Sequence, residues 1–121
     1  MNANPKLQLV VRAGAGYDTI DVDHCAKQSV YVANCPGKNS HAVAELTLGL
    51  ILSIDRRIPE GVQLLREQKW NKGMFANCNG IKGRTLGLVG FGNIARLVME
   101  RAKAFELNVL VHTIPYIPGL D

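Results

Sequence analysis

One glycine-rich stretch, residues 85–95, constrains the fold of this chain more than any other feature. A short apolar run there is followed by two glycines one residue apart. Leu86, Leu88 and Val89 predict a short buried strand, and the residues after the glycines predict an amphipathic helix, because apolar side chains recur at helical spacing. A second strand is predicted at residues 108–112, so the whole is a βαβ unit. The apolar helix residues are Ile94, Leu97, Val98, Ala102 and Phe105.

The two glycines of this unit, Gly90 and Gly92, predict a site for a dinucleotide. The N-terminus of a helix leaves backbone N–H groups unpaired and carries about half a positive charge, which favours phosphates. Glycine has no Cβ, so a pyrophosphate can approach the backbone closely. Gly90 would form the tight turn, Gly92 would admit the phosphates, and Ala95 is small enough for close helix–strand packing. The alternative is a glycine turn with a structural role only.

The position that would bind the adenosine ribose departs from the usual pattern. An Asp or Glu is expected about 20 residues after the glycines, at the end of the second strand. In this chain the strand is followed by Thr113, which offers one weaker hydrogen bond. No Arg or Lys follows Lys103, so the sequence shows no partner for the 2′-phosphate of NADP. These observations favour NAD as the cofactor, with a reduced affinity.

The first forty residues predict a smaller βαβ-like unit. Residues 7–11 predict a strand that ends in the loop Arg12–Gly16, and such a small-residue loop can hold an anion with its backbone N–H groups. An ordinary turn is the alternative. Asp21 is expected to cap a short helix, and residues 29–33 predict the second strand. Residues 34–40 contain Pro, Gly and Asn, which indicates a loop and a domain boundary.

Between the two units, residues 41–55 predict a helix that is apolar on nearly every side. Such a helix is usually buried, so we expect it to lie between two lobes or against another subunit. It falls short of the roughly 20 apolar residues of a membrane span, so no membrane interaction is expected. A further helix is predicted from Pro59 to about Trp70, and a polar connector over residues 71–82.

Composition and charge argue against several classes of function. The net charge is +4, but the basic residues are scattered and not interleaved with aromatic residues, so no nucleic-acid interface is expected. The three cysteines form no C-x-x-C pair, and an odd number without a signal peptide favours a reducing, cytoplasmic location. The histidines do not stand at metal-ligand spacing with them, so no metal site is expected.

Five motifs follow one another in an order that resembles a known family. They occupy residues 12–23, 32–40, 44–47, 69–70 and 83–94, and read RAGAGYDTIDVD, VANCPGKNS, AELT, KW and GRTLGLVGFGNI. Their order and spacing resemble those of the D-isomer-specific 2-hydroxyacid dehydrogenases, most closely the phosphoglycerate dehydrogenase-like members. The resemblance extends over nearly the whole chain.

This resemblance implies an α/β fold with two parts. Residues 1–39 are expected to form the end of a flavodoxin-like substrate-binding lobe, and residues 40–121 the first half of a doubly wound (Rossmann) NAD-binding lobe. Arg12, Ala13 and Gly14 are expected to face the carboxylate of a small 2-hydroxy or 2-oxo acid, with backbone donors binding it. The residues expected to bind NAD are Gly90, Gly92, Asn93, Ile94 and Thr113.

The resemblance also bears on the catalytic residues. Relatives use an Arg, an acidic residue and a His for catalysis, all in a later part of their sequences, and none matches a position here. No catalytic residue is therefore assigned, and we expect a fragment of an NAD-dependent oxidoreductase that is not catalytic alone. Its full-length form is expected to be a homodimer, with 3-phosphoglycerate as one candidate substrate.

Two other functions stay open from the sequence. The C-terminal-binding corepressors share this fold and similar motifs, so the chain can also be a non-catalytic NAD-sensing or partner-binding module. A vestigial remnant without a stable fold is the third possibility, because an unpaired strand edge and an apolar interface helix favour aggregation.

Overall fold

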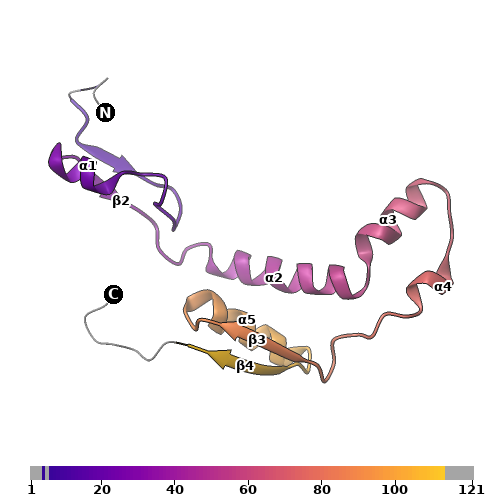
Figure 1. Cartoon of the computed structure of the whole chain (residues 1–121). Helices are drawn as coiled ribbons and strands as arrows, with labels where there is room; N and C mark the ends of the chain where they lie inside the picture. Colours follow the sequence, from indigo (N-terminus) through magenta and orange to yellow (C-terminus); the bar gives the residue numbers. More distant parts are fainter. Residues whose placement is uncertain (1–3, 5, 114–121) are drawn as a thin grey trace. The chain divides into compact units, whose positions relative to one another are not determined.

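The computed structural model describes residue 4 and residues 6–113, and the chain divides into two compact units, Met1–Ser40 and His41–Asp121. Each unit contains a pair of parallel strands connected through helical segments (Figure 1). The predicted α/β class is therefore confirmed.

The first unit consists of β1 (Leu9–Val11), α1 (Val22–Lys27) and β2 (Tyr31–Ala33). The two strands pair in parallel along their whole length. Asp21 caps α1 as predicted, because its Oδ1 accepts a hydrogen bond of 2.8 Å from the His24 N–H. The second strand is shorter than predicted, since Ser29 adopts a left-handed conformation (φ 56°) in the turn that follows the helix.

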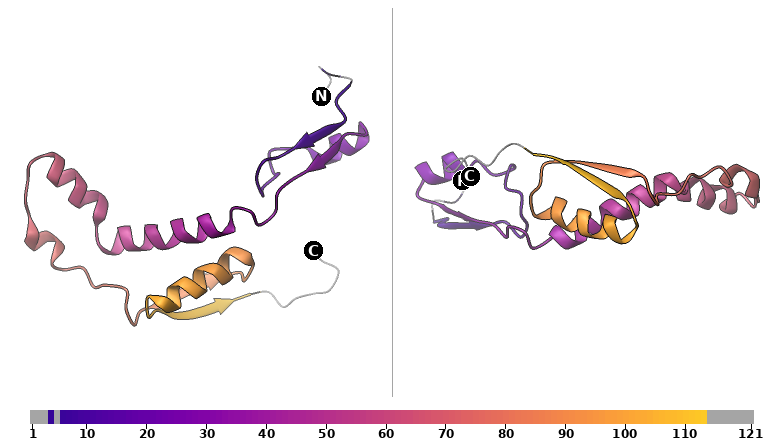
Figure 2. Two further views of the ribbon diagram at one scale, coloured as in Figure 1. Left: turned by 180° about the vertical axis from the view of Figure 1, so that it is seen from behind. Right: turned by 90° about the horizontal axis from the view of Figure 1, so that it is seen from below.

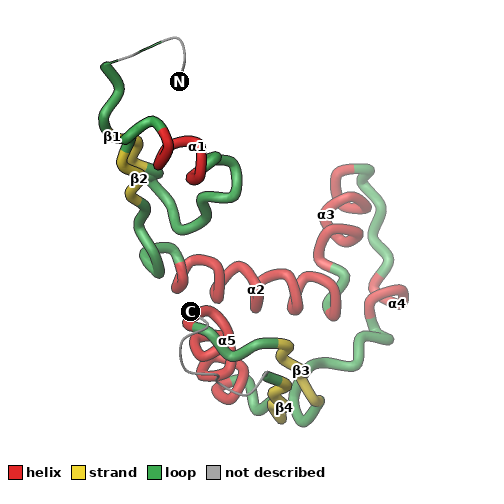
Figure 3. The backbone as a smooth tube through the Cα atoms, turned by 60° about the vertical axis from the view of Figure 1, so that its left-hand side comes forward, coloured by secondary structure: helices red, strands yellow, loops and turns green. Residues whose placement is uncertain are grey.

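The second unit contains a parallel strand pair with helical cover. Its elements are α2 (Ser40–Asp55, which starts at the last residue of the first unit), α3 (Ile58–Arg66), α4 (Lys72–Phe75), β3 (Thr85–Val89), α5 (Asn93–Ala104) and β4 (Asn108–His112). Figure 2 and Figure 3 show α5 alongside β3 and β4. The strands pair from Thr85 opposite Asn108 to Val89 opposite His112, so the predicted βαβ unit is present.

The core of the second unit lies where α2 and α5 meet one face of this strand pair. Ala44 and Leu48 of α2 form a buried cluster with Val98 of α5, against which Leu86 and Leu88 of β3 pack. A second cluster joins the segment before β3 to the end of α5 and the start of β4, and consists of Ile81, Ala102 and Leu107.

The prediction of a buried strand is wrong for Val89, whose side chain is 90% exposed. Successive side chains of a strand point to opposite faces of the sheet. Leu86 and Leu88 point toward the core, so Val89 lies on the other face, which no described part of the second unit covers.

Within the second unit, α2 is buried on one face only. That its other face lies between two lobes or against another subunit stays a prediction. Ala44 and Leu48 are buried, whereas Leu46, Leu50 and Ile54 are between 54% and 78% exposed. Only one face of α2 packs on the strand layer of this unit, and the opposite apolar face is left open to solvent.

The helix predicted to continue to about Trp70 ends at Arg66 instead. Gln68 has a φ of 58°, and the N–H of Lys69 donates to the carbonyl of Leu64, so the backbone turns away from the helix axis. Trp70 therefore lies beyond the helix and is 80% exposed. The ammonium of Lys69, 2.8 Å from the carboxylate of Glu67, lowers the pKa of Glu67, with a smaller contribution from a Gln63 hydrogen bond.

Candidate functional site

The glycine turn after β3 has the geometry of a phosphate-binding turn. Gly90 has a φ of 91°, a conformation that favours glycine, and its N–H donates to the carbonyl of His112 at 2.7 Å. Gly92 is the N-cap of α5 and has an ordinary φ of −77°. A Cβ added at Gly92 would meet no heavy atom within 4 Å. Neither the backbone conformation nor internal packing therefore requires glycine at position 92, and the space beside it is open.

The N-terminus of α5 points its unpaired donors at this open space. The N–H groups of Asn93, Ile94 and Ala95 belong to the first turn and have no acceptor within the helix. No side chain caps the helix, and its first turn contains no acidic residue. The turn is therefore electropositive and suited to an anion.

The end of β4 lies at the same edge of the sheet as the glycine turn. Val89 pairs with His112, so the residues that follow the two parallel strands emerge side by side. Thr113 directly follows β4. The structure thus brings together all five residues predicted to bind NAD: Gly90, Gly92, Asn93, Ile94 and Thr113. Position 114, which follows Thr113, lies outside the described residues.

The predicted substrate loop after β1 is held in place by backbone hydrogen bonds. The Arg12 N–H donates to the carbonyl of Ala33, which extends the strand pairing, and the Gly14 carbonyl accepts from Cys35. The side-chain amide of Asn34 donates to the Ala15 carbonyl at 2.8 Å. Asn34 and Cys35 hold the loop in place, although neither was predicted to do so from the sequence. Their position directly after β2, next to the end of β1, could have indicated this role.

Arg12, Ala13 and Gly14 form one tight turn within this loop. The Gly14 N–H donates to the Arg12 carbonyl at 2.8 Å, so this donor is already engaged. The Arg12 side chain folds over Gly14, and its Nη1 would lie 3.1 Å from a Cβ added there. In this conformation the guanidinium of Arg12 lies next to the loop backbone, where both can meet an anion.

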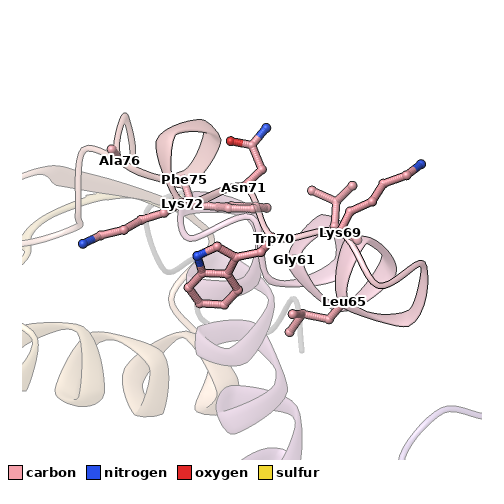
Figure 4. A pocket seen from close by; sticks show the side chains of 9 residues that line it. Gly61, Leu65, Lys69, Trp70, Asn71, Lys72, Phe75 and Ala76 are labelled. Atoms are coloured by element: carbon pink, nitrogen blue, oxygen red, sulfur yellow. The ribbon is translucent and has the colours of Figure 1, made fainter.

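An apolar pocket between α3 and α4, which the sequence analysis did not predict, has a volume of about 310 Å³ (Figure 4). Arg57 lies against it, with its guanidinium 5.8 Å from the centroid of the Phe75 ring. The pocket lining is mostly apolar, with the polar side chains of Lys69, Asn71 and Lys72 among it. Its lining residues are Gly61, Leu64, Leu65, Lys69, Trp70, Asn71, Lys72, Phe75 and Ala76.

Neither a metal-binding cluster nor a membrane-spanning helix is present among the described residues. Residues 4 and 6–113 contain no group of three or more His, Cys, Asp or Glu side chains placed to hold a metal ion. Within the same residues, no helix has the length and hydropathy that a membrane crossing requires.

Comparisons with known proteins match nearly the whole chain. The sequence profile of the D-isomer specific 2-hydroxyacid dehydrogenase catalytic domain matches residues 1–113. The D-3-phosphoglycerate dehydrogenase of Methanocaldococcus jannaschii is 41% identical over 113 residues, which are 93% of this chain and 21% of that protein. The chain therefore spans about a fifth of the length of this curated relative.

Solved structures give the same result. The NAD-dependent formate dehydrogenase from Staphylococcus aureus in complex with NAD matches with a TM-score of 0.79 and 31% identity, over 97% of this chain and 35% of that one. The NADPH-dependent glyoxylate/hydroxypyruvate reductase from Sinorhizobium meliloti in complex with NADP and malonate matches with a TM-score of 0.80 and 35% identity, over 98% and 38%. The chain belongs to the D-isomer-specific 2-hydroxyacid dehydrogenase family.

Proposed function

We propose that this chain carries the cofactor turn and the substrate loop of an oxidoreductase that transfers a hydride between a small 2-hydroxy acid and NAD. The observation that carries this proposal is the open space at Gly92. Neither the packing nor the backbone conformation requires glycine at this position. Gly92 lies at the N-terminus of α5, where the pyrophosphate of a dinucleotide needs to approach the backbone closely.

The residues around Gly92 fit a dinucleotide. The N–H groups of Asn93 and Ile94 would donate to the pyrophosphate. The turn at Gly90 would leave space for the pyrophosphate beside the backbone. Thr113, at the end of the adjacent strand, would lie at the adenosine ribose. The nicotinamide, when bound, accepts or returns the hydride, while these residues only hold and orient the cofactor.

NAD is favoured over NADP by the residues after β4. Thr113 carries no positive charge, and residues 113–121, which follow β4, contain no Arg or Lys to pair with a 2′-phosphate. The similar solved structures include one complex with NAD and one with NADP, which supports a nicotinamide dinucleotide as the cofactor class.

The substrate side of the proposal rests on the loop at Arg12. Its guanidinium and the neighbouring backbone would hold the carboxylate of a 2-hydroxy or 2-oxo acid. The named relatives act on acids of this kind or on formate, and 3-phosphoglycerate is one candidate substrate. No residue of this chain is assigned to catalysis. In the family's later part, the His would exchange a proton with the substrate hydroxyl, the acidic residue would support the His, and the Arg would hold the carboxylate.

A homodimer completes the proposal, because the exposed apolar face of α2 needs a partner.

The named relatives are all oxidoreductases, so neither a corepressor-like module nor a vestigial remnant gains support from them.

Calorimetric titration of the chain with NAD tests the cofactor assignment. Gly92→Ala places a methyl group where the pyrophosphate would lie, so we expect at least about a tenfold loss of affinity. Gly49→Ala is the matched control, since a Cβ there also meets nothing within 4 Å but lies in the middle of α2. Equal NAD affinities for the two variants would contradict the proposal, provided that both have the circular dichroism of the wild type.

A further inference from the structure

We propose that Arg96 is a cofactor-binding residue whose guanidinium binds the pyrophosphate, and that Phe91 holds this side chain at the turn. This inference rests on the proposed function and extends it to a side chain that the family motif does not single out.

The first support is the position of the guanidinium. Its Cζ lies 4.5 Å from the centroid of the Phe91 ring, well within the distance of a cation–π interaction. Phe91 directly precedes the N-cap residue Gly92, and Arg96 is the fourth residue of α5. These are the two positions whose side chains commonly pack together at the start of a helix. The Arg96 cation is therefore held at the N-terminal end of α5, beside the open space at Gly92.

The second support is that this cation has no carboxylate partner. Glu100 lies one turn further along α5, at a spacing that permits an ion pair, but the Arg96 side chain stacks on Phe91. Within residues 6–113, no Asp or Glu oxygen lies within 4 Å of the Arg96 guanidinium. The side chain is exposed, so its donors are available to a ligand.

The third support is electrostatic. A cation near the N-terminus of a helix is repelled by the helix dipole, and the first turn of α5 contains no acidic residue to offset this repulsion. An anion bound at the turn would remove the repulsion and accept charge-assisted hydrogen bonds from the guanidinium. Asn93, the other polar side chain of the first turn, carries no charge.

Of the phosphates in a nicotinamide dinucleotide, the pyrophosphate is the one we assign to Arg96. Phe91 is bonded to Gly92, at which the pyrophosphate would sit, whereas a 2′-phosphate would lie near Thr113 at the end of β4. Binding of a 2′-phosphate is the competing outcome, and NADP distinguishes it from the pyrophosphate.

The test compares two substitutions in calorimetric titrations with NAD, NADP and adenosine. Arg96→Leu keeps an apolar contact with Phe91 but removes the charge, and Arg96→Lys keeps the charge. We expect Arg96→Leu to weaken NAD binding about tenfold or more without changing adenosine binding, and Arg96→Lys to recover part of the loss. Added salt should weaken NAD binding less in Arg96→Leu than in the wild type.

Three results would overturn this assignment. Unchanged NAD affinity in Arg96→Leu would show that the residue serves only the packing of the helix start. A loss confined to NADP would move the contact to the 2′-phosphate, and an equal loss for adenosine would indicate a distorted turn. If Arg96→Leu does not fold, Arg96→Gln replaces it, because Gln is also uncharged and favours helix.

The outcome also separates this inference from the proposed function. If Gly92→Ala weakens NAD binding and Arg96→Leu does not, only the role of Arg96 is wrong. If the wild-type chain does not bind NAD, both proposals are wrong.

Discussion

At the scale of single residues, an ion pair with one buried partner joins the end of α2 to the residue before β3. Asp55, the last residue of α2, has a side chain only 7% exposed, and its Oδ1 lies 2.8 Å from Nη1 of Arg84, whose own side chain is 58% exposed. Its Oδ2 is buried without a hydrogen-bond partner among the described residues. A buried carboxylate is costly unless it is paired, so the stability of this junction depends on Arg84.

Arg84→Met is therefore expected to lower the free energy of unfolding by about 1–3 kcal/mol, because it leaves the Asp55 carboxylate buried and unpaired. Urea denaturation measures this loss. Lys82→Met is the matched control: Lys82 and Glu106 are also 2.8 Å apart, but their side chains are 77% and 63% exposed. Such an exposed pair contributes at most about 1 kcal/mol. Equal losses in both variants would contradict the explanation that the burial of the Asp55 carboxylate makes its pairing important.

Predictions for single residues succeeded where the chemistry of that residue alone determines its conformation or its hydrogen bond. The left-handed turn at Gly90 and the Asp21 cap follow from the chemistry of glycine and aspartate alone. The Asp55–Arg84 pair and the Phe91–Arg96 stack could not be predicted in this way. The ion pair joins residues 29 positions apart. The stack forms because the long Arg96 side chain contacts Phe91 and not another neighbour, which the sequence does not reveal.

At the scale of elements, alanine substitutions at two glycines of the second unit are expected to change the stability in opposite directions. Gly49 lies in the middle of α2 with nothing within 4 Å of an added Cβ, so Gly49→Ala should stabilise the chain by about 0.5–1 kcal/mol. Gly83 has a φ of 74°, so Gly83→Ala should destabilise it, by about 1 kcal/mol or more. Thermal unfolding of both variants measures these effects. A shift of the same sign in both would show that backbone conformation does not determine their stability.

The sequence predicted elements with a strong periodic pattern and failed where elements end or meet. The unit from β3 to β4 follows from alternating and helical periodicities, and its bounds were predicted closely. The end of α3 was missed because Gln68, a residue with no preference for positive φ, adopts the left-handed conformation there. The exposure of Val89 was missed because an apolar run does not reveal whether the second face of a strand is covered.

At the scale of the whole molecule, the exposed face of α2 predicts self-association. Leu46, Leu50 and Ile54 are 62%, 54% and 78% exposed, and they recur at helical spacing along one side of α2. A contiguous apolar surface of this kind typically marks a protein interface. If the homodimer uses it, Ile54→Lys should shift the chain toward monomer.

Sedimentation equilibrium measures this shift. Val22→Lys is the control, because it adds the same charge at an exposed apolar residue of α1, outside the proposed interface. A monomeric wild-type chain, or an equal shift in both variants, would contradict the proposed homodimer.

The positions of the five proposed cofactor-binding residues could be predicted almost completely, because these residues follow two strands whose parallel pairing the pattern implies. That they bind NAD stays a prediction. The loop proposed to bind substrate could be predicted as a loop after β1, but the hydrogen bond from its Gly14 N–H could not, since a bond within three residues leaves no sequence pattern. The pocket beside Trp70 was missed because it depends on how α3 and α4 pack.

The binding of NAD at the turn between β3 and α5 is the central claim, and a two-dimensional ¹H–¹⁵N NMR titration of the chain tests it most directly. The amide signals of Gly92, Asn93, Ile94 and Ala95 report on the N–H groups that would face the pyrophosphate. We predict that NAD shifts these signals progressively and saturably, while those of α1 stay unchanged. If millimolar NAD leaves them in place, or shifts amides throughout the chain equally, this turn is not the cofactor site.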